Sequence, residues 1–339
     1  MYKNKIIQED LKRICDEYDF SWLRGKTVLV TGALGMLAYY YTAALFYLND
    51  GKDYGIKVIL LARREEVLKK EFGDRKDVTL LVQDVCEEIK LSQPVDVILH
   101  AAGRADPEAF KENPVGVIEA NVKGTQNVLE LAKDKKARVI FISTREVYGA
   151  VSKSPVEETD AGVLNQTELR SCYPESKRMA ENLIVSYAYQ YGVKYQITRL
   201  AHAYGPMMKI QGDGRVMADL LGRAVRGEDI VLKSNGEAKR AFCYVADAVA
   251  GLLLLTVAKE DNQVYNIANE TEEISIRELG EDLAKWYGLG FDIQLENDDN
   301  AYVKFARTAL DTRKIESLGW KPLTRLEDGV RRTMEFFKG

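Results

Sequence analysis

Short runs of apolar residues alternate along the chain with longer stretches of mixed character. Six runs come before residue 201, and they occupy residues 26–32, 58–62, 79–84, 96–103, 138–144 and 195–200. Their apolar members are mostly Val, Ile and Leu in continuous succession, which is typical of strands buried on both faces of a sheet. Helical stretches separate most of the runs, and such alternation indicates βαβ units. The pattern therefore predicts an α/β fold with a doubly wound parallel sheet.

The pattern changes before and after these six runs. Residues 1–24 have apolar positions at helical spacing, which predicts a helical extension packed on the body. After the last run, Gly, charged residues and turn signals become more frequent. We expect a main domain at 25–200 that returns at about 241–269, and a smaller C-terminal lobe made of 201–240 and 270–339.

Composition and charge argue against several classes of function. The 339 residues carry a net charge of −4 without a basic block, so nucleic-acid binding is not expected. The most apolar stretches, 39–48 and 248–258, are too short to span a membrane, and residues 1–12 do not resemble a secretory signal. Four scattered cysteines without a C-x-x-C motif are typical of reduced thiols in a cytoplasmic protein. With two histidines, a His-based metal site is not expected.

A glycine-rich turn follows the first apolar run. The segment T-G-A-L-G-M-L-A at 31–38 joins a strand to a helix, the context in which a glycine pattern predicts a Rossmann-type dinucleotide site. Gly32 permits the tight turn, and Gly35 permits close approach of the pyrophosphate. Met36 and Leu37 then begin the helix, whose N-terminal amides and positive dipole end favour a phosphate.

The ends of the next strands supply further candidates for cofactor binding. NAD-binding domains usually carry a carboxylate after the second strand, where this chain has Ala62-Arg63-Arg64. Arg63 could pair with a 2′-phosphate, so this turn favours NADP+. The other candidates for the cofactor site are Asp84 (for the adenine amine), Val85, Ala101, Ala102, Gly103, Asn121 (for the backbone near the active site) and Ser143.

A tyrosine and a lysine at helical spacing supply the candidate chemistry. Tyr173 and Lys177, in Y-P-E-S-K, are four residues apart and therefore share one face of a helix. We expect the ammonium to lower the pKa of the phenol toward neutrality, so that a tyrosinate takes a hydroxyl proton while a hydride leaves. Ser143 or Thr144, in S-T-R-E-V-Y-G at 143–149, would hold the same substrate oxygen.

Together these motifs resemble the extended short-chain dehydrogenase/reductase family, in its nucleotide-sugar branch. The matching segments are T-G-x-x-G-x-x-A, H-A-A-G, N-V-x-G-T-x-N-V-L, S-T-x-E-V-Y-G, Y-x-x-x-K and R-x-x-x-x-Y-G-P, and the resemblance covers roughly 25–339. It implies an enzyme with tightly bound NAD(P)+ that oxidises C4 of a hexose on a nucleoside diphosphate, and by itself it favours NAD+. The C-terminal lobe would bind the nucleotide sugar. A homodimer is implied as well, through helices near 107–133 and 175–191.

Within this branch, several segments are most similar to those of UDP-glucuronate decarboxylases. They are R-S-C-Y-P-E-S-K-R, D-G-R-V, G-E-D-I and R-A-F-C-Y-V. Nucleotide-sugar 4,6-dehydratases and 4-epimerases are near relatives, and both reactions stay open as alternatives. A more distant alternative is a non-catalytic dinucleotide-binding protein on the same fold, against which Thr144, Tyr173 and Lys177 argue.

Two residues after Thr144 bear on the choice of reaction. By the resemblance, dehydratases carry S-T-D-E-V-Y-G, in which the Asp protonates the departing C6 hydroxyl and the Glu removes the C5 proton. This chain has Arg145 at the Asp position and retains Glu146. A guanidinium does not give up a proton near pH 7, so ordinary dehydration lacks its acid. Arg145 could instead hold a substrate carboxylate, or it could form a structural salt bridge.

The resemblance also implies contacts to the nucleotide sugar. His202 stands where relatives often carry an Asn that touches the sugar diphosphate. Arg215 with its neighbour Val216, Arg240 and Arg307 stand at positions that contact the nucleotide or pyrophosphate in relatives. Arginine suits phosphate because its planar fork gives paired, charge-assisted bonds.

Overall fold

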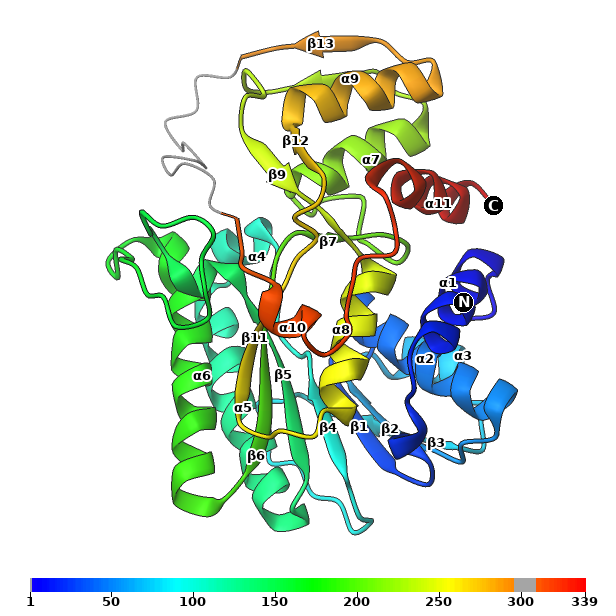
Figure 1. Ribbon diagram of the computed structural model, residues 1–339, viewed down its shortest axis with the longest axis vertical. Helices are drawn as coiled ribbons and strands as arrows, with labels where there is room; N and C mark the ends of the chain where they lie inside the picture. Colours follow the sequence, from blue (N-terminus) through cyan, green and yellow to red (C-terminus); the bar gives the residue numbers. More distant parts are fainter. Residues whose placement is uncertain (1, 296–308) are drawn as a thin grey trace.

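A seven-stranded sheet forms the centre of the computed structural model, which describes residues 2–295 and 309–339 (Figure 1). Its strand order is β11-β6-β5-β4-β1-β2-β3, and every neighbouring pair is parallel. The chain starts at β1 in the interior of the sheet, moves out to β3, and then crosses back to place β4 on the other side of β1. This reversal is the topological switch point beside which doubly wound folds bind their ligands. The strands are β1 (Thr27–Thr31), β2 (Lys57–Ala62), β3 (Val78–Val82), β4 (Val97–His100), β5 (Arg138–Thr144), β6 (Lys194–Leu200) and β11 (Gln263–Ile267).

The predicted doubly wound parallel sheet is confirmed, and each of the six apolar runs overlaps one of its strands. All five residues of β1 and all four of β4 are buried. Such burial explains why these strands read as continuous apolar runs rather than as an alternation. The seventh strand, β11, pairs with β6 from a later part of the chain.

Alternate residues of the strands face two separate hydrophobic cores. Val28 and Val30 of β1 pack in one core with α1, α2 and α8, whereas Leu29 packs in the other core with α5 and α6. The alternation follows from the two-residue period of side chains along a strand. The helices that cover the two faces are α1 (Lys5–Glu17), α2 (Met36–Lys52), α8 (Val245–Val257), α5 (Pro114–Lys135) and α6 (Cys172–Tyr191).

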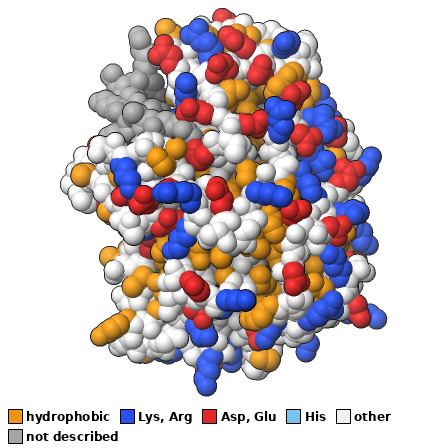
Figure 2. Space-filling model, in the orientation of Figure 1, with side chains coloured by type: hydrophobic (Ala, Val, Ile, Leu, Met, Phe, Trp, Pro, Cys, Tyr) orange, Lys and Arg blue, Asp and Glu red, His pale blue; other side chains and the backbone are white. Residues whose placement is uncertain are grey.

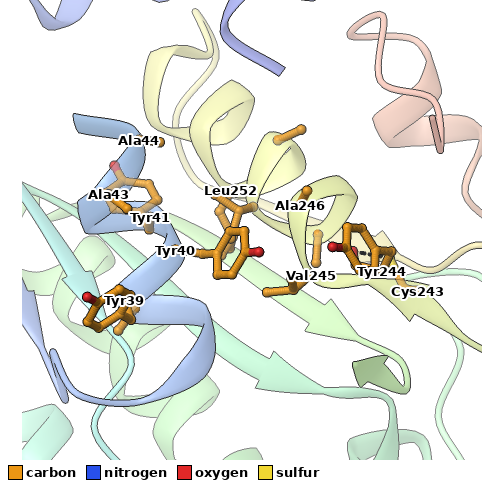
Figure 3. Packing of buried hydrophobic residues seen from close by; sticks show 14 of the residues in the cluster. Tyr39, Tyr40, Tyr41, Ala43, Ala44, Cys243, Tyr244, Val245, Ala246 and Leu252 are labelled. Atoms are coloured by element: carbon orange, nitrogen blue, oxygen red, sulfur yellow. Dashed lines mark hydrogen bonds between the residues drawn. The ribbon is translucent and has the colours of Figure 1, made fainter. Parts of the chain in front are cut away.

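Three consecutive tyrosines of α2 show how the first core accommodates polar groups (Figure 3). Residues 39–41 are almost completely buried. Their hydroxyls bond, in order, to Glu71 at 2.9 Å, to Asp10 at 3.0 Å and to Thr256 at 2.8 Å. A buried phenol usually needs such a partner. Each tyrosine therefore connects α2 to a different helix, namely α3 (Glu65–Phe72), α1 and α8.

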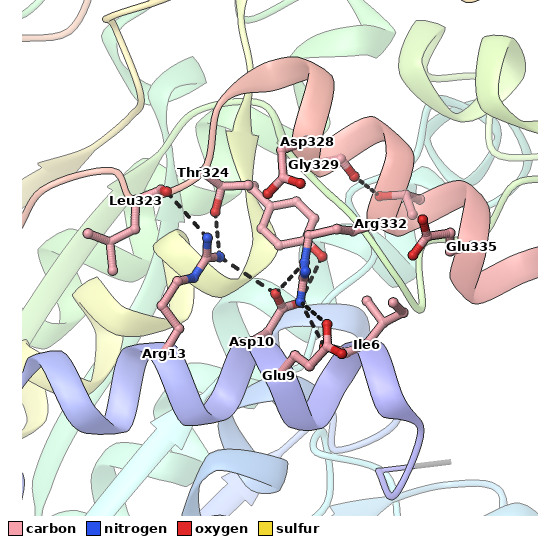
Figure 4. A network of polar contacts seen from close by, with 12 residues as sticks. Ile6, Glu9, Asp10, Arg13, Leu323, Thr324, Asp328, Gly329, Arg332 and Glu335 are labelled. Carbon is pink, nitrogen blue, oxygen red and sulfur yellow. Dashed lines mark hydrogen bonds and ion pairs between the residues drawn. The ribbon is translucent and has the colours of Figure 1, made fainter. Parts of the chain in front are cut away.

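A buried carboxylate connects the N-terminal helix α1 to the C-terminal helix α11 (Leu326–Lys338) (Figure 4). Asp10 is fully buried, and it accepts hydrogen bonds from the Tyr40 hydroxyl at 3.0 Å, the Tyr244 hydroxyl at 2.7 Å and Arg332 Nε at 2.8 Å. Burial raises the pKa of Asp10, although the Arg332 guanidinium and the hydroxyls act in the opposite direction. The N-terminal segment is thus joined to the rest of the chain through a satisfied polar network.

Part of the chain after β6 forms a smaller lobe, at the top of Figure 1. In it, β12 pairs antiparallel with β9, and β13 pairs parallel with β8. The lobe elements are α7 (Val216–Arg226), β8 (Ile230–Leu232), β9 (Lys239–Ala241), β12 (Glu273–Ser275), α9 (Ile276–Tyr287) and β13 (Phe291–Ile293). The remaining elements are α4 (Pro107–Glu112), β7 (Ala203–Tyr204), β10 (Cys243–Tyr244), α10 (Arg313–Glu316) and the 3₁₀ turns η1 (Ser21–Leu23), η2 (Arg145–Tyr148) and η3 (Leu169–Ser171).

The surface carries both signs of charge, and Lys and Arg side chains are interspersed with Asp and Glu on the face in Figure 2. Within residues 2–295 and 309–339, none of the helices combines the length and apolar character that crossing a bilayer requires. The same residues contain no group of three or more His, Cys, Asp or Glu side chains arranged to hold a metal ion. All four cysteines are free thiols.

Candidate active site

The turn between β1 and α2 has the geometry of a phosphate-binding turn. Gly32 has a φ of +66°, and a Cβ there would lie 2.8 Å from the backbone of Ala102 at the end of β4. Gly35 is the N-cap residue of α2, and no side chain caps this helix. The orphan amides of the first turn, where Met36 and Leu37 lie, are the groups that bind phosphate in dinucleotide sites. The residues present therefore fit a pyrophosphate at this turn.

A second close approach occurs where β4 ends. A Cβ on Gly103 would lie 2.9 Å from Oδ1 of Asn121 and 4.0 Å from Nζ of Lys177. Asn121 donates through Nδ2 to Ser176 Oγ at 2.9 Å, between the two members of the Tyr–Lys pair. Its Oδ1 is buried and has no hydrogen-bond partner among the described residues. An unsatisfied acceptor beside Lys177 is unusual in a protein interior, and this observation fits a site that binds a ligand.

The candidate adenosine residues lie together at the exposed end of β2 and β3. Arg63 Nη1 lies 3.3 Å from Oδ2 of Asp84, and the Arg63 side chain is mostly exposed. The backbone amide of Cys86 donates to Asp84 at 2.9 Å, and this bond lowers the pKa of Asp84. Val85 packs against Gly124 of α5, where a Cβ would come within 2.8 Å of it. Arg63 is therefore engaged with the carboxylate that the sequence suggests for adenine.

Helix α6 and strand β5 bring the candidate catalytic groups together. Tyr173 lies in the first turn of α6, and its hydroxyl shares a hydrogen bond with the side chain of Thr144 at the end of β5. One turn further along α6, Lys177 Nζ donates to the carbonyl oxygen of Ile142 at 2.8 Å. Both Tyr173 and Lys177 are buried. Residues about thirty positions apart in the sequence thus converge where β5 ends.

Burial dominates the titration of this pair. Desolvation, together with the nearby Glu146 carboxylate, raises the pKa of Tyr173 above its ordinary value. Desolvation also lowers the pKa of Lys177 to about 7. We predicted that the Lys177 ammonium would lower the pKa of the Tyr173 phenol toward neutrality. This prediction is wrong for the chain without a bound cofactor. The Thr144 bond and the charges of Arg170 and Arg215 do lower this pKa, but burial outweighs them.

The structure separates the roles of Ser143 and Thr144. The hydroxyl of Ser143 donates to Oε1 of Glu181 at 2.5 Å. Glu181 also accepts from Arg199, through Nε at 3.1 Å and Nη2 at 2.7 Å. Ser143 therefore belongs to a buried polar network, and Thr144 is the residue whose side chain meets the Tyr173 hydroxyl.

A second cluster around Glu146 was not predicted from the sequence. Arg170, in η3, donates through Nη2 to both oxygens of Glu146 at 2.9 and 2.7 Å. The Arg170 guanidinium also lies 4.5 Å from the ring centroid of Phe110, whose ring stacks on that of Tyr173 at 4.8 Å. Arg170 stands three residues before Tyr173, so its place beside the Tyr–Lys motif was the available signal. Arg145 lies half-buried in η2, directly after Thr144.

The lobe contributes one candidate to the surroundings of Tyr173. Arg215, the N-cap residue of α7, pairs with Asp213 at 2.5 and 2.8 Å, and its charge reaches Tyr173. The other candidates lie in the lobe and its connections. They are Val216 at the start of α7, His202 with its ring 5.9 Å from that of Phe242, Arg240 in β9, and Arg307, which lies outside the described residues.

These features define a class of protein. A doubly wound sheet, a phosphate-type turn at its switch point and a Thr144–Tyr173–Lys177 cluster at the same edge are the features of a short-chain dehydrogenase/reductase. The sequence profile described as the NAD dependent epimerase/dehydratase family matches residues 28–268. The chain belongs to this family and is an enzyme of this type.

Known relatives act on nucleotide sugars. UDP-glucuronic acid decarboxylase 5 from Arabidopsis thaliana is 33% identical over 311 residues, which cover 92% of this chain and 89% of that protein. UDP-glucose 4-epimerase from Thermotoga maritima, solved with UDP-glucose, is 25% identical with a TM-score of 0.78, covering 92% of this chain and 98% of that one. A dTDP-glucose 4,6-dehydratase from Streptomyces venezuelae, solved with NAD, shares the fold at 23% identity and a TM-score of 0.77, covering 92% and 97%.

Proposed function

We propose that this enzyme oxidises C4 of the hexose of a UDP sugar, and that its substrate is UDP-glucuronate, which loses its C6 carboxylate as CO2. The observation that carries the proposal is the place of Thr144, Tyr173 and Lys177. Lys177 Nζ donates to the carbonyl oxygen of Ile142, two residues before Thr144 on β5. Thr144 acts on the buried phenol of Tyr173, one helical turn before Lys177. The identity of about a third with a UDP-glucuronic acid decarboxylase over nearly the whole chain supports the choice of substrate.

The buried cluster has the groups that C4 oxidation requires. Thr144 orients the C4 hydroxyl, and Tyr173 takes its proton as a general base. Lys177, whose pKa of about 7 lets it exist in either protonation state, passes the proton on toward solvent. NAD+, when bound, accepts the hydride, and the positive charge of its ring favours the phenolate form of the tyrosine. Before the cofactor binds, the high pKa of Tyr173 keeps its phenol protonated.

The residues after Thr144 favour decarboxylation over dehydration. Once C4 is a ketone, the C5–C6 bond of a uronate breaks, and its electron pair is delocalised into the ketone. Arg145 can hold the C6 carboxylate through charge-assisted bonds, whereas it cannot supply the proton that a departing C6 hydroxyl needs. A 4-epimerase is the second candidate, because Thr144, Tyr173 and Lys177 serve that reaction equally well and an epimerase shares the fold.

The nucleotide sugar and the cofactor each have candidate binding residues in this chain. We propose that Arg215 and Val216 at the start of α7, with His202, Arg240 and Arg307, bind the nucleotide and diphosphate. NAD(P)+ is held tightly by the turn at Gly32 and Gly35. Arg63 can bind the 2′-phosphate of NADP+ when the ion pair between Arg63 and Asp84 breaks.

We propose a homodimer formed through α5 and α6, which pack side by side. Large apolar side chains are exposed on both helices, and they are Val115, Ile118, Met179, Val185 and Tyr189. Exposed apolar surface of this kind is typical of an association face. Met179→Glu should shift the protein from dimer to monomer in light scattering after gel filtration, and an unchanged dimer would rule out this face.

The reaction can be identified from the mass of the product. The purified enzyme is incubated in three separate reactions, each with NAD+ and one nucleotide sugar. The three sugars are UDP-glucuronate, UDP-glucose and dTDP-glucose. We expect UDP-glucuronate alone to react, with loss of CO2. Loss of water from either glucose nucleotide would indicate a dehydratase, and a product of unchanged mass but altered retention would indicate an epimerase. Either result would overturn the proposal.

A further inference from the structure

We infer that Arg170 is a positioning residue, which holds Glu146 beside the Tyr173 phenol and prevents it from removing the C5 proton of the 4-keto intermediate. The inference rests on the proposed function, because it concerns the step after C4 oxidation. It assigns Arg170 a role in choosing between two fates of one intermediate, namely loss of CO2 and exchange or inversion at C5.

The contacts of Arg170 are directed at this one carboxylate. Nη2 donates to both oxygens of Glu146, at 2.9 and 2.7 Å. Nη1 is buried and has no hydrogen-bond partner within the described part of the chain. The guanidinium lies 4.5 Å from the ring centroid of Phe110. The contact with the ring and the two bonds to one carboxylate together restrain the guanidinium, and a lysine ammonium does not have this planar, multiply donating group.

Glu146 lies close enough to the reacting centre for its restraint to matter. Its charge acts on the phenol of Tyr173, and so does the charge of Arg170. Phe110 stacks on the ring of Tyr173 at 4.8 Å and also contacts Arg170, so the ion pair and the phenol share one wall. The hydroxyl that Tyr173 deprotonates is on C4, and the C5 hydrogen is on the adjacent carbon. An unrestrained carboxylate at this place would be a base for that hydrogen.

Two reactions compete for the 4-keto uronate. In the first, the C5–H bond breaks, the proton goes to Glu146, and the electron pair forms an enolate with the C4 ketone. Return of a solvent proton then gives exchange or inversion at C5. In the second, the C5–C6 bond breaks, CO2 leaves, and the electron pair of that bond forms the enolate with the C4 ketone. Because Arg170 bonds both oxygens of Glu146, it opposes the first reaction and leaves the second.

The test measures exchange rather than turnover alone. UDP-glucuronate is incubated with NAD+ in D2O, and deuterium at C5 of the recovered UDP-glucuronate is compared with the CO2 released. We expect little exchange in the wild type and a rise of roughly 10²–10⁴-fold in the ratio of exchange to CO2 in Arg170→Gln, the range that a positioned base contributes. Arg170→Lys should give an intermediate ratio. Adding Glu146→Gln to Arg170→Gln should return the ratio to the wild-type level.

The matched control is Arg226→Gln, which removes a guanidinium that pairs bidentately with Glu228 on the surface. This variant should keep the wild-type ratio. An unchanged ratio in Arg170→Gln would overturn the inference, and so would exchange that persists in the double variant. Arg170→Lys decides the matter if Arg170→Gln does not fold. If the wild type releases no CO2, the proposed function fails, and the rate of C5 exchange on UDP-glucose, compared between the wild type and the same variants, tests Arg170 separately.

Discussion

At the scale of single residues, the chemistry of this enzyme gathers around the phenol of Tyr173. Thr144 bonds its hydroxyl, Phe110 stacks on its ring, and the charges of Glu146 and Arg215 reach it from η2 and the lobe. The phenol is buried, so each neighbour acts through a medium that screens charge weakly. Substitutions among these neighbours of the Tyr173 phenol should therefore alter catalysis more than they alter stability.

Tyr173→Phe should abolish C4 oxidation and leave the fold intact, because only the hydroxyl is removed from a well-packed ring. Loss of a general base typically lowers the rate by ~10²–10⁴-fold. Product formation from UDP-glucuronate measures the loss. Tyr191→Phe, at an exposed position of the same helix, is the control and should react normally. Near-normal turnover in Tyr173→Phe would remove this residue from the role of base.

Arg63→Ala should weaken NADP+ selectively. Arg63 is mostly exposed and already pairs with Asp84, so it can turn to a 2′-phosphate at little cost. A charge-assisted bond contributes about 1.5–3 kcal/mol, which corresponds to roughly ten- to a hundredfold in affinity. Calorimetry with each dinucleotide checks this, with the neighbouring Arg64→Ala as the control. Equal effects on NAD+ and NADP+ would show that Arg63 does not read the 2′-phosphate.

The sequence predicted the placement of residues whose positions depend on local spacing. Tyr173 and Lys177 share a face because they are four apart on one helix, and Gly32 and Gly35 follow a strand directly. Phe110 and Arg170 could not be predicted in the same way, because α4 and η3 are distant in sequence and meet only in the folded chain. The pKa of Tyr173 was mispredicted for a related reason, since spacing does not reveal burial.

At the scale of elements, the strands of the sheet were the most predictable part of the fold. β1, β2 and β4 are buried on both faces, so their apolar runs stand out from the helices between them. The short strands of the lobe, such as β8 and β9 with three residues each, give no such signal. Their pairing depends on contacts across the chain, as in β13 with β8.

The contact between α1 and α11 should be essential for stability. Asp10→Ala would leave the Arg332 guanidinium and the hydroxyls of Tyr40 and Tyr244 without their shared acceptor. Breaking a buried pair in this way typically costs about 3–5 kcal/mol. Urea unfolding measures the loss, and Glu9→Ala, which removes a more exposed contact of Arg332, should change stability by less than about 1 kcal/mol. Equal effects of the two variants would contradict this account of the network.

A second buried carboxylate, Asp247 of α8, should make stability depend on pH. Burial raises its pKa from 3.8 to about 6, although the backbone amide of Thr324 donates to it at 3.0 Å. Between pH 3.8 and about pH 6, Asp247 is therefore protonated in the folded state and ionised in the unfolded state. The folded state loses stability as the pH rises through this window. Two pKa units correspond to at most about 3 kcal/mol.

Asp247→Asn keeps an acceptor for Thr324 and removes the titration. As the pH rises from about 4 to about 6, the free energy of unfolding of the wild type should therefore fall relative to that of the variant, by up to about 3 kcal/mol. Urea unfolding at several pH values gives both curves. Parallel curves for the two proteins would mean that Asp247 does not titrate in this range.

At the scale of the whole molecule, the reaction depends on a sheet domain and a lobe that meet at one edge of the sheet (Figure 1). The sheet provides the glycine turn and Thr144, α6 provides Tyr173 and Lys177, and Arg215 reaches the same phenol from the start of α7. This arrangement suits a reaction in which the substrate is oxidised, changed and reduced again without leaving the site.

The most direct measurement uses UDP-glucuronate labelled with ¹³C at C6, with NAD+ at a concentration equal to that of the enzyme. We predict that ¹³CO2 is released over many turnovers, because the hydride taken from C4 returns to the product and regenerates NAD+. We also predict no accumulation of NADH beyond a small fraction of the enzyme. Retention of the label in the nucleotide sugar, or a single turnover that leaves one NADH per enzyme, would contradict the account.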